Sequence, residues 1–284
     1  MDCRLVETAV AQRDGHLALL ALDWAKAFDS INPEAMVVGL RRFGLPEHVV
    51  EIVKNIYSVR RFRVKDGGAR SERRAQDSGI SQGCPLSPFL FVLLMTVIIQ
   101  DAVDTLSSED RQKYQSGNLA TLLYADDTLL VGESGPILQR LLDAIATTGA
   151  AYGMELHWKK FQLLQIKGEF VVNAPDGTQI NAATTMSYLG STLREDGTIR
   201  NEICRRLGVG WADFSKMARL WRHTSLPRAR KVQIFQAVVT SKLLYGLSSA
   251  WLNVCEQRRI DGLQPRCLRV FSASSQPIGR ESPT

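Results

Sequence analysis

Two adjacent carboxylates, Asp126 and Asp127, stand between two short apolar runs at residues 119–123 and 128–131. This pattern predicts two antiparallel strands that reverse at or beside Asp126. Like charges this close repel each other, and a divalent cation is the simplest compensation. Carboxylate oxygens suit Mg²⁺, which usually takes one or two protein carboxylates and fills its shell with water and substrate phosphates. The alternative is a solvated Asp-Asp turn.

A third carboxylate, Asp23, follows the apolar run at residues 17–22. The run predicts a buried strand that delivers Asp23 at its carboxyl end. A helix is expected next, with Asn32 as its N-cap, Pro33 at its first position and Gly44 at its end.

A second helix is predicted over residues 46–57, with Val49, Ile52, Val53 and Ile56 on one buried face. A long helix is predicted over residues 89–106, with Ser87 as its cap and Pro88 in its first turn. The Gly-rich loop before it contains Gln82, whose amide can donate and accept hydrogen bonds. Taken alone, this loop is an ordinary junction between a loop and a helix.

The net charge of +6 is unevenly distributed. Residues 1–193 carry 19 Lys and Arg against 22 Asp and Glu, whereas residues 194–284 carry 16 against 7. A local segment, residues 60–74, holds seven basic side chains around Gly67-Gly68 and predicts an exposed hairpin. Such basic surfaces suit a phosphate backbone, although a solvated charged face is the alternative.

The chain is expected to be an intracellular, soluble protein. Its longest apolar run, residues 89–99, is too short to cross a bilayer, and no signal peptide is visible. The five cysteines are scattered without a Cys-x-x-Cys pair, so neither zinc nor a disulfide framework is indicated, and we expect reduced, mostly buried thiols.

Three segments carry a family resemblance: LDWAKAFDSI at 22–31, GISQGCPLSPFLF at 79–91 and YADD at 124–127. In this order they resemble the palm motifs of reverse transcriptases, in particular those of non-LTR (LINE-type) retrotransposons. Further along, Gly153 with Lys159-Lys160 resembles the next palm motif, although Phe161 stands where Thr or Cys is common in the family. Residues 188–190, Tyr-Leu-Gly, resemble the turn that presses on the primer strand.

The resemblance covers nearly the whole chain and implies an α+β fold. A polymerase palm, an antiparallel sheet backed by helices, is expected over residues 1–193 with partial fingers. A basic, helical, thumb-like region is expected over 194–284, with long helices at 199–220 and 227–245. Most of the fingers and any endonuclease domain are expected to lie outside this chain.

The implied function is RNA-directed DNA polymerisation, in which a primer 3′-hydroxyl attacks a deoxynucleoside triphosphate (dNTP) on an RNA template. Two ions of Mg²⁺ or Mn²⁺ would be held by carboxylates from separate segments. The site predicted from the resemblance comprises three groups of residues. The metal ligands are Asp23, Asp126 and Asp127, with a backbone carbonyl of Leu22 or Trp24; the nucleotide pocket is Phe28, Gln82, Gly83 and Lys160; and the primer and template contacts are Tyr124, Tyr188, Leu189, Gly190, Arg61 and Arg63.

Three of these assignments have structural alternatives. Phe28, expected to exclude a 2′-hydroxyl, could be an ordinary core phenylalanine. Lys160, expected near the leaving pyrophosphate, could be a solvated lysine, and the Tyr124 ring could lie in the core. Asp29 is expected to pair near its turn rather than bind a metal.

Three functions are compatible with paired carboxylates in this setting. The first is a reverse transcriptase, the second is a non-catalytic nucleic-acid-binding remnant, and the third is another palm enzyme such as a nucleotide cyclase. The Gln82 loop, the position of Phe28 and the Tyr-Leu-Gly turn argue against the third. With the fingers incomplete, we expect weak or absent polymerase activity from the isolated chain. The resemblance also implies work on nuclear DNA and no membrane partner.

Overall fold

The computed structural model describes residues 2–13, 15–223, 226–247, 250 and 252–273. Contacts divide the chain into two units, one formed by His16–Met186 and one by the described parts of Met1–Gly15 and Ser187–Thr284. We call them the sheet unit and the helical unit and describe each by itself. This division falls before the domain boundary predicted after residue 193, and it groups the first helix with the helical unit.

The sheet unit is built on five strands in the order β11-β10-β1-β8-β7. The strand predicted at residues 17–22 is confirmed as β1 (Leu17–Leu22), which lies at the centre of the sheet. It pairs antiparallel with β8 (Asp127–Gly132) and with β10 (Gln162–Ile166). The edge strands are β7 (Leu119–Tyr124), antiparallel to β8, and β11 (Ala182–Ala183), parallel to β10. Five of the six residues of β1 are buried, on both faces of the sheet, which explains why the strand is apolar throughout.

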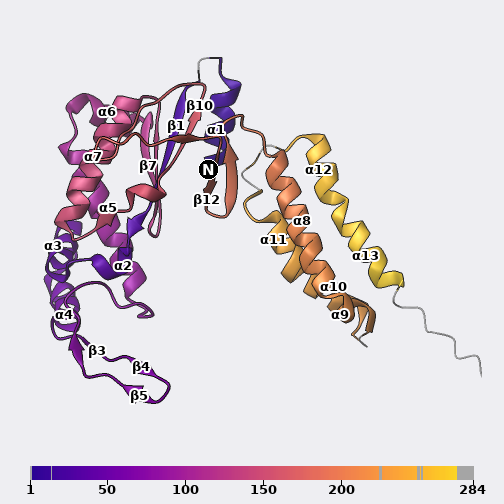
Figure 1. Cartoon of the computed structure of the whole chain (residues 1–284), viewed down its shortest axis with the longest axis horizontal. Coiled ribbons are helices and arrows are strands. Elements are labelled where there is room, and N and C mark those ends of the chain that lie inside the picture. Colours follow the sequence, from indigo (N-terminus) through magenta and orange to yellow (C-terminus); the bar gives the residue numbers. More distant parts are fainter. Residues whose placement is uncertain (1, 14, 224–225, 248–249, 251, 274–284) are drawn as a thin grey trace, which may run out of the picture. The chain divides into compact units, whose positions relative to one another are not determined.

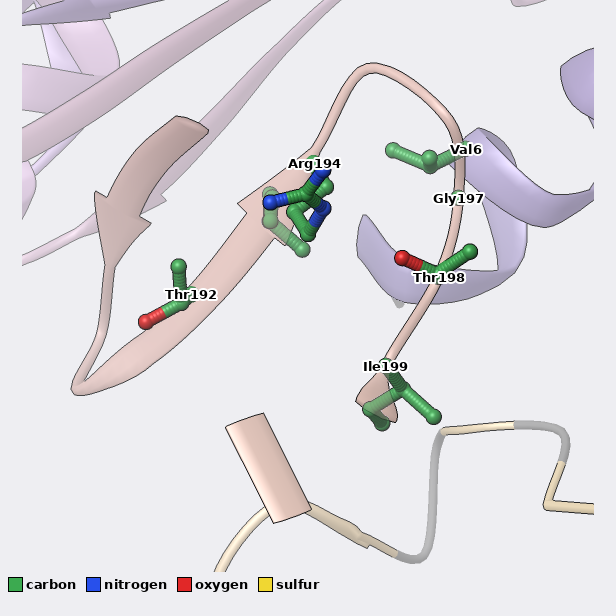
Figure 2. Close-up of a pocket in the computed structure, with 7 residues that line it drawn as sticks. Val6, Thr192, Arg194, Gly197, Thr198 and Ile199 are labelled. Carbon is green, nitrogen blue, oxygen red and sulfur yellow. The ribbon is translucent and has the colours of Figure 1, made fainter. Parts of the chain in front are cut away.

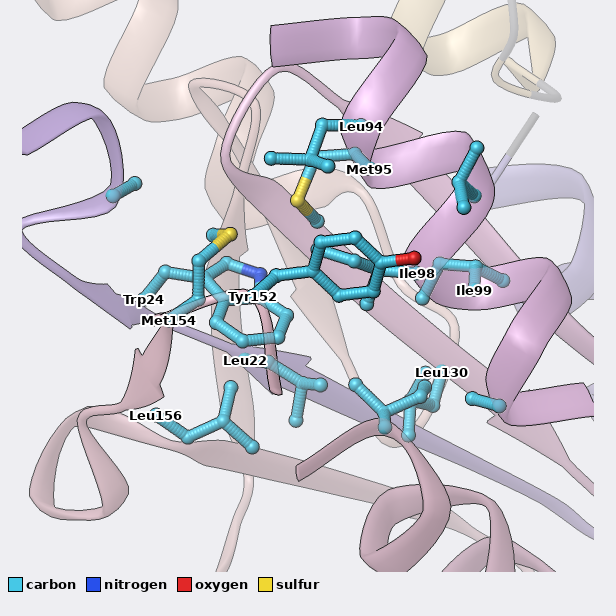
Figure 3. Packing of buried hydrophobic residues seen from close by; sticks show 14 of the residues in the cluster. Leu22, Trp24, Leu94, Met95, Ile98, Ile99, Leu130, Tyr152, Met154 and Leu156 are labelled. Atoms are coloured by element: carbon cyan, nitrogen blue, oxygen red, sulfur yellow. The ribbon is translucent and has the colours of Figure 1, made fainter. Parts of the chain in front are cut away.

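Helices α3 (Pro33–Phe43), α5 (Ser87–Thr105) and α7 (Gly135–Ala151) surround the main core of this unit. Figure 3 shows the Tyr152 ring among side chains of α5 and of the strands, with Trp24 and Leu22 beside it. Helix α5 is long and apolar enough to span a membrane by length and composition, but half of it is buried inside the unit. It packs against α3 and α7, so core packing accounts for its apolar sequence.

The predicted caps of α3 are confirmed. The Asn32 side chain accepts hydrogen bonds from the backbone N–H groups of Glu34 and Ala35, Pro33 occupies the first turn, and Gly44 ends the helix with φ 95°. The positive φ is readily available to glycine, which explains its place at the C-terminus.

The buried face predicted for the next helix, α4 (Glu47–Ser58), is confirmed at Val53 but wrong at Ile52 and Ile56. Ile52 and Ile56 are 58% and 49% exposed, and the buried residues are Val50, Val53 and Tyr57. The predicted residues and the buried residues both have helical spacing. Because α4 packs chiefly on α3, only the row of side chains that faces α3 is buried.

The basic segment forms the predicted hairpin. Strands β3 (Arg61–Phe62) and β6 (Arg74–Ala75) pair, as do β4 (Lys65–Asp66) and β5 (Ala69–Arg70), and all four are exposed. Figure 1 shows this hairpin extending beyond the end of α4. Its basic side chains therefore face solvent.

The cap predicted for the long helix is wrong. Helix α5 begins at Ser87 itself, after Leu86, and no side chain caps it. The Ser87 hydroxyl instead donates to the carbonyl of Ser81 at 2.6 Å, because the preceding loop folds back over the helix start. Ser87 therefore fixes the Gly-rich loop rather than the helix terminus.

The helical unit begins with α1 (Asp2–Ala11) and resumes at Ser187, within β12 (Thr185–Tyr188), which pairs with β13 (Ser191–Arg194). Figure 1 shows its later helices lying beside one another. They are α8 (Arg200–Lys216), α9 (Ala218–His223), α10 (Arg228–Phe235), a π-helical turn (Gln236–Thr240), α11 (Ser241–Leu244), α12 (Val254–Asp261) and α13 (Leu263–Ala273). The long helix predicted at 199–220 is divided near Met217, whereas the one predicted at 227–245 runs without a break from Arg228 to Leu244, with the π-helical turn inside it.

Aromatic rings form the centre of the helical core. The Phe214 ring stacks on Trp221 with centroids 5.4 Å apart, and the Trp221 indole donates to the Phe214 carbonyl at 2.8 Å. The structure describes the side chains of four of the five cysteines; these four are free thiols, and among them Cys267 alone is buried. The prediction of mostly buried thiols is therefore wrong for the cysteines that the structure describes.

Candidate active site

Asp23 lies between β1 and the short strand β2 (Trp24–Ala25). In the antiparallel register, Leu22 of β1 pairs with Thr128 of β8. One step further along both strands, Asp23 is level with Asp127. The strand pairing thus brings together two carboxylates that are about a hundred residues apart in sequence.

The hairpin of β7 and β8 carries the other carboxylate. Tyr124 pairs with Asp127, which leaves Ala125 and Asp126 as the two turn residues, as the sequence predicts. Ala125 has φ 55°, an uncommon conformation for a residue with a Cβ atom. The Tyr124 side chain is 65% exposed, so the alternative that its ring lies in the core is wrong.

The carboxylates influence one another electrostatically. Partial burial raises the pKa of Asp127, and the negative charges of Asp126 and Asp23 raise it further. Protein atoms exclude some of the water around this carboxylate although the residue remains exposed. The ionised form of Asp127 is therefore disfavoured unless a positive charge offsets the repulsion.

Lys160 supplies such a charge to Asp23. Its Nζ lies 3.1 Å and 3.4 Å from the two carboxylate oxygens of Asp23. Strand β9 (Glu155–Leu156) pairs with β2, and the Asp23 carbonyl accepts from the N–H of His157 at 2.7 Å. These bonds place the 3₁₀ turn Trp158–Lys160 beside Asp23. The sequence predicts Lys160 in the nucleotide pocket, and the structure pairs it with a predicted metal ligand.

The donor chemistry of the three aspartates fits a divalent cation, since all are carboxylates and their repulsion raises the pKa of Asp127. Their arrangement is not that of a closed ligand set. Within the described ranges, no three His, Cys, Asp or Glu side chains form a group that could hold a metal ion. A cation bound between them would draw the carboxylates closer together and share Asp23 with Lys160.

The Gly-rich loop docks on the turn that follows Asp23. The N–H of Gly79 donates to the Ile31 carbonyl at 2.7 Å, and the N–H of Ile80 donates to the Phe28 carbonyl at 2.6 Å. A Cβ atom on Gly79 would lie 2.7 Å from the Asp29 Cα, so only glycine permits this approach. The Gln82 amide donates to the Asp29 carboxylate at 3.1 Å, which confirms the pairing expected for Asp29.

The Phe28 side chain is held in place by the main core of the sheet unit. Its ring stacks on Phe91 of α5 with centroids 4.4 Å apart and planes at 15°. The side chain is half-buried and packs against the main core. The alternative that Phe28 is a core phenylalanine is thus partly confirmed, and its role against a 2′-hydroxyl stays a prediction.

Arg60 is a site residue that sequence reasoning did not single out. It donates to the carbonyl of Gly79 at 2.6 Å and to the hydroxyl of Ser81 at 3.1 Å, and its guanidinium lies 4.2 Å from the centre of the Tyr57 ring. Burial lowers the pKa of Arg60. Arg60 therefore ties the base of the basic hairpin to the loop, whereas Arg61 and Arg63 are exposed. The spacing of Tyr57 and Arg60 is the signal that could have suggested this anchor.

The Tyr-Leu-Gly turn belongs to the helical unit. Leu189 and Gly190 have φ values of 47° and 75°, as in the tight turn of a hairpin. Tyr188 is only 7% exposed, so its ring packs inside the unit, and the predicted primer contact of the turn stays a prediction. The turn itself remains at the surface.

A small pocket in the helical unit, shown in Figure 2, lies between Val6 of α1 and the segment from Thr192 to Ile199. Its volume is about 20 Å³, close to that needed by a single water molecule. None of the predicted site residues lines it, and it is far too small for a nucleotide.

Comparison with known proteins identifies the family. A model of the family described as reverse transcriptase (RNA-dependent DNA polymerase) matches residues 2–193. The chain belongs to the reverse transcriptase family. This assignment removes the nucleotide cyclase alternative and confirms the resemblance stated from the three motifs.

The similar proteins are named as products of retrotransposable or mobile elements, in keeping with the resemblance to non-LTR retrotransposon enzymes. The Pol polyprotein of the element R2DM from Drosophila melanogaster is 27% identical over 254 residues, which cover 85% of this chain and 23% of the polyprotein. The RNA-directed DNA polymerase of the mobile element jockey from Drosophila funebris is 23% identical, covering 89% of this chain and 28% of that protein. The chain spans less than half the length of the curated relatives it matches.

Solved structures show the same fold. Telomerase from Candida albicans, in complex with a fragment of telomeric RNA, has a TM-score of 0.54 and 12% identity, and the alignment covers 96% of this chain and 53% of that one. Telomerase from Candida tropicalis has a TM-score of 0.51 and 11% identity over the same share of this chain and 49% of that one. The predicted α+β class, with a sheet backed by helices, is confirmed.

Proposed function

We propose that this chain carries the polymerase site of a non-LTR retrotransposon protein and extends a DNA primer on an RNA template from dNTPs. One observation carries the proposal. The β1–β8 register sets Asp23 level with Asp127, and the pKa of Asp127 is raised by partial burial and, further, by the charges of Asp126 and Asp23. An acidic edge of this kind supports nucleotidyl transfer assisted by two divalent ions.

The carboxylates of Asp23, Asp126 and Asp127, with a backbone carbonyl of Leu22 or Trp24, would hold two Mg²⁺ or Mn²⁺ ions. When bound, these ions supply Lewis acidity at the reacting phosphate and offset its developing charge. Asp23 and Asp127 come from adjacent strands and Asp126 from the turn, so the sheet fixes two donors and the hairpin tip supplies the third. Lys160 keeps Asp23 paired until a cation takes its place.

The nucleotide would lie against the surface formed by Phe28, Gln82 and Gly83. Stacking on Phe91 fixes the Phe28 ring, so it can act as a rigid barrier to a ribose 2′-hydroxyl. The Gln82 amide is positioned by Asp29, and Gly83 has open space where a side chain would stand. A backbone without a side chain at Gly83 allows a ligand to approach closely.

Exposed residues would contact the primer and template. Arg61 and Arg63 project from the basic hairpin and suit phosphate contacts. The exposed Tyr124 ring beside the acidic turn could support the primer end. In the helical unit, the backbone of Leu189 and Gly190, rather than the buried Tyr188 ring, would meet the strand.

A second function is supported by a different observation. Lys160 neutralises Asp23, and the carboxylates of the described chain are not gathered into a ligand group. A chain fixed in this arrangement would bind nucleic acid without extending it.

Primer extension distinguishes the two functions. The parent chain is incubated with a DNA primer on an RNA template, dNTPs and Mg²⁺ or Mn²⁺, beside the Asp126→Asn/Asp127→Asn variant and an Asp143→Asn control on α7. We expect weak extension by the parent and the control, and none by the double variant. Salt-sensitive duplex binding without extension by any of the three proteins would favour the non-catalytic function.

A further inference from the structure

The Gly-rich loop, residues 79–86, is buried in its first part and exposed further along. Residues 79–80 are buried, whereas residues 82–83, which the proposed function places against the nucleotide, are exposed. Two parts of the chain that are distant in sequence hold the buried part, namely the turn at residues 28–31 and Arg60. The position of the exposed part therefore depends on these contacts.

Arg60 donates two hydrogen bonds to the loop. Its Nη2 lies 2.6 Å from the carbonyl oxygen of Gly79, and its Nη1 lies 3.1 Å from the hydroxyl of Ser81. The N–H of Gly79 donates to the Ile31 carbonyl at 2.7 Å. Gly79 is thus held by the turn through its N–H and by Arg60 through its carbonyl. Hydrogen bonds from an ionised guanidinium are stronger than those between neutral groups, so Arg60 contributes a large part of this restraint.

Arg60 is itself fixed by its neighbours. At the backbone, the Arg60 carbonyl accepts from the N–H of Gln76 at 2.9 Å, across the base of the basic hairpin. At the end of the side chain, the guanidinium carbon lies 4.2 Å from the centre of the Tyr57 ring, and Tyr57 of α4 is only 5% exposed. A guanidinium stacked on a buried ring is held in place, so its two bonds to the loop act as a rigid link.

The surroundings of Arg60 are those of a restrained group rather than of a solvated charge. Burial lowers the pKa of Arg60, and its Nε is buried without a hydrogen-bond partner. In the part of the chain that the structure describes, no carboxylate forms an ion pair with it. Desolvating a charged group without a counter-charge costs free energy, and the contacts with the loop and with the Tyr57 ring offset this cost.

Ser81 connects Arg60 to the exposed part of the loop. Its hydroxyl accepts from Arg60, and its carbonyl accepts from the Ser87 hydroxyl at 2.6 Å. Ser81 directly precedes Gln82, whose side-chain amide donates to the Asp29 carboxylate at 3.1 Å. The backbone before Gln82 and the amide at the end of its side chain are therefore held by separate contacts. Both are needed to keep the amide in one position, because either contact alone leaves the other end free to move.

We propose that Arg60 is a positioning residue for the incoming dNTP. It acts through Gly79 and Ser81, and it holds the Gly-rich loop in the conformation in which Gln82 and Gly83 face the nucleotide. The proposal rests on the proposed function, because that function supplies the dNTP. A loop that is ordered before binding loses less conformational entropy when the ligand arrives, so Arg60 increases the affinity for the nucleotide.

Hydrogen exchange of the whole chain, followed by mass spectrometry, measures how often the loop opens. Peptides that contain the N–H groups of Gly79 and Ile80 report the loop, and peptides from β1 report global unfolding. Arg60→Gln should speed exchange in the loop about tenfold or more and leave β1 unchanged. Arg74→Gln is the matched control, because it removes the same charge from an exposed strand of the same hairpin. Its loop should exchange like that of the parent.

A more conservative variant covers the case in which Arg60→Gln lowers the stability of the whole chain. Ser81→Ala removes only the hydroxyl that accepts from Arg60 and leaves the guanidinium in the protein. It should speed exchange in the loop severalfold. Exchange in β1 and thermal unfolding, followed by circular dichroism, should stay like those of the parent.

Primer extension supplies the functional readout. Arg60→Gln should raise the KM for the dNTP about three- to tenfold and keep kcat within about twofold, because the lost interaction supports the bound nucleotide equally in the ground state and the transition state. A partly unfolded enzyme would instead lower kcat and leave KM unchanged. Arg60→Lys keeps the charge but lacks the planar fork, so it should restore only part of the affinity lost in Arg60→Gln.

The two readouts separate this proposal from the proposed function. Equal exchange in the loops of the parent, Arg60→Gln and Arg74→Gln would overturn the proposal. Extension by the parent and by Arg60→Gln with the same KM would also overturn it, and would retain the polymerase function. Faster exchange in the loop of Arg60→Gln alone, in a chain that never extends a primer, would retain the restraint of the loop by Arg60 and remove the polymerase function.

Discussion

The Trp24 indole N–H donates to the Thr128 hydroxyl at 3.0 Å, and both side chains are buried. Each residue directly follows an aspartate of the candidate site, Asp23 in one case and Asp127 in the other. The bond therefore links the two strand segments that carry opposing carboxylates. It holds the acidic edge together at a place where like charges push the strands apart.

Removing this bond should loosen the site. Trp24→Phe keeps most of the aromatic surface but leaves the fully buried Thr128 hydroxyl without its donor, which should cost about 1–3 kcal/mol of unfolding free energy. Urea unfolding measures the loss. Trp24→Phe/Thr128→Val removes both polar groups and should recover part of the stability. A double variant no more stable than the single one would show that the bond is not the cause.

Two glycines of the same loop should respond differently to alanine. Both have positive φ, 83° at Gly79 and 84° at Gly83, so each replacement introduces backbone strain of about 1 kcal/mol. At Gly79 the new Cβ would also collide with the Asp29 backbone, whereas nothing lies within 4 Å at Gly83. We expect Gly79→Ala to be less stable than Gly83→Ala by at least about 2 kcal/mol in urea unfolding. Equal losses would contradict the docking of the loop on Asp29.

The local parts of this architecture could be predicted from sequence because their determinants lie within a few residues. Asn32, Pro33 and Gly44 set the bounds of α3 by capping alone, and the hairpin at Asp126 followed from the two flanking apolar runs. The prediction of the buried face of α4 was partly wrong because the sequence of this helix contains two overlapping rows of apolar residues. Only the packing partner, α3, decides that Val50 rather than Ile52 is buried.

The prediction of the site residues was limited in the same way, because contacts between distant segments are not visible in the sequence. Types and order of residues indicated Asp23, Asp126 and Asp127, but not the ion pair between Asp23 and Lys160, which are 137 residues apart. Arg60 and Ser87 were missed in their present roles because both hold the Gly-rich loop through bonds formed only after the chain folds. The burial of Tyr188 could likewise not be predicted, since a tyrosine in a strand can lie on the buried or on the exposed face of a sheet.

Asp127 should make stability depend on pH. Its pKa is raised in the folded chain, so it favours folding at low pH, where it is neutral, and this contribution is lost as the pH rises through the raised value. Asp127→Asn should therefore equal the parent at low pH and become more stable as the pH rises, by at most about 1 kcal/mol because solvent screens the charges. Unfolding curves recorded from below the ordinary aspartate pKa, about 3.9, up to neutral pH test this.

The Asp23→Asn/Asp127→Asn double variant provides the control for this pH effect. Asp23 contributes to the raised pKa of Asp127, so the gain from Asp127→Asn should shrink in an Asp23→Asn background. An undiminished gain would mean that the two carboxylates do not interact.

Lys160 should compete with a cation for Asp23. The pair is exposed, with 58% and 38% of the two side chains accessible, so its energy is modest. Lys160→Gln should strengthen Mn²⁺ binding about two- to fivefold at low salt, with a smaller effect at high salt. Lys159→Gln changes the same charge on the neighbouring residue and serves as the control. Equal affinities for the two variants would show that Lys160 does not restrain Asp23.

The central claim is that Asp23, Asp126 and Asp127 act together as a divalent cation site. Titration of Mn²⁺, followed by water proton relaxation in the presence of primer–template and dNTP, tests it most directly. We predict saturable binding by the parent and by Asp143→Asn, and its loss in Asp23→Asn and in Asp126→Asn/Asp127→Asn. Mn²⁺ binding unchanged in both of these last two variants would contradict the account.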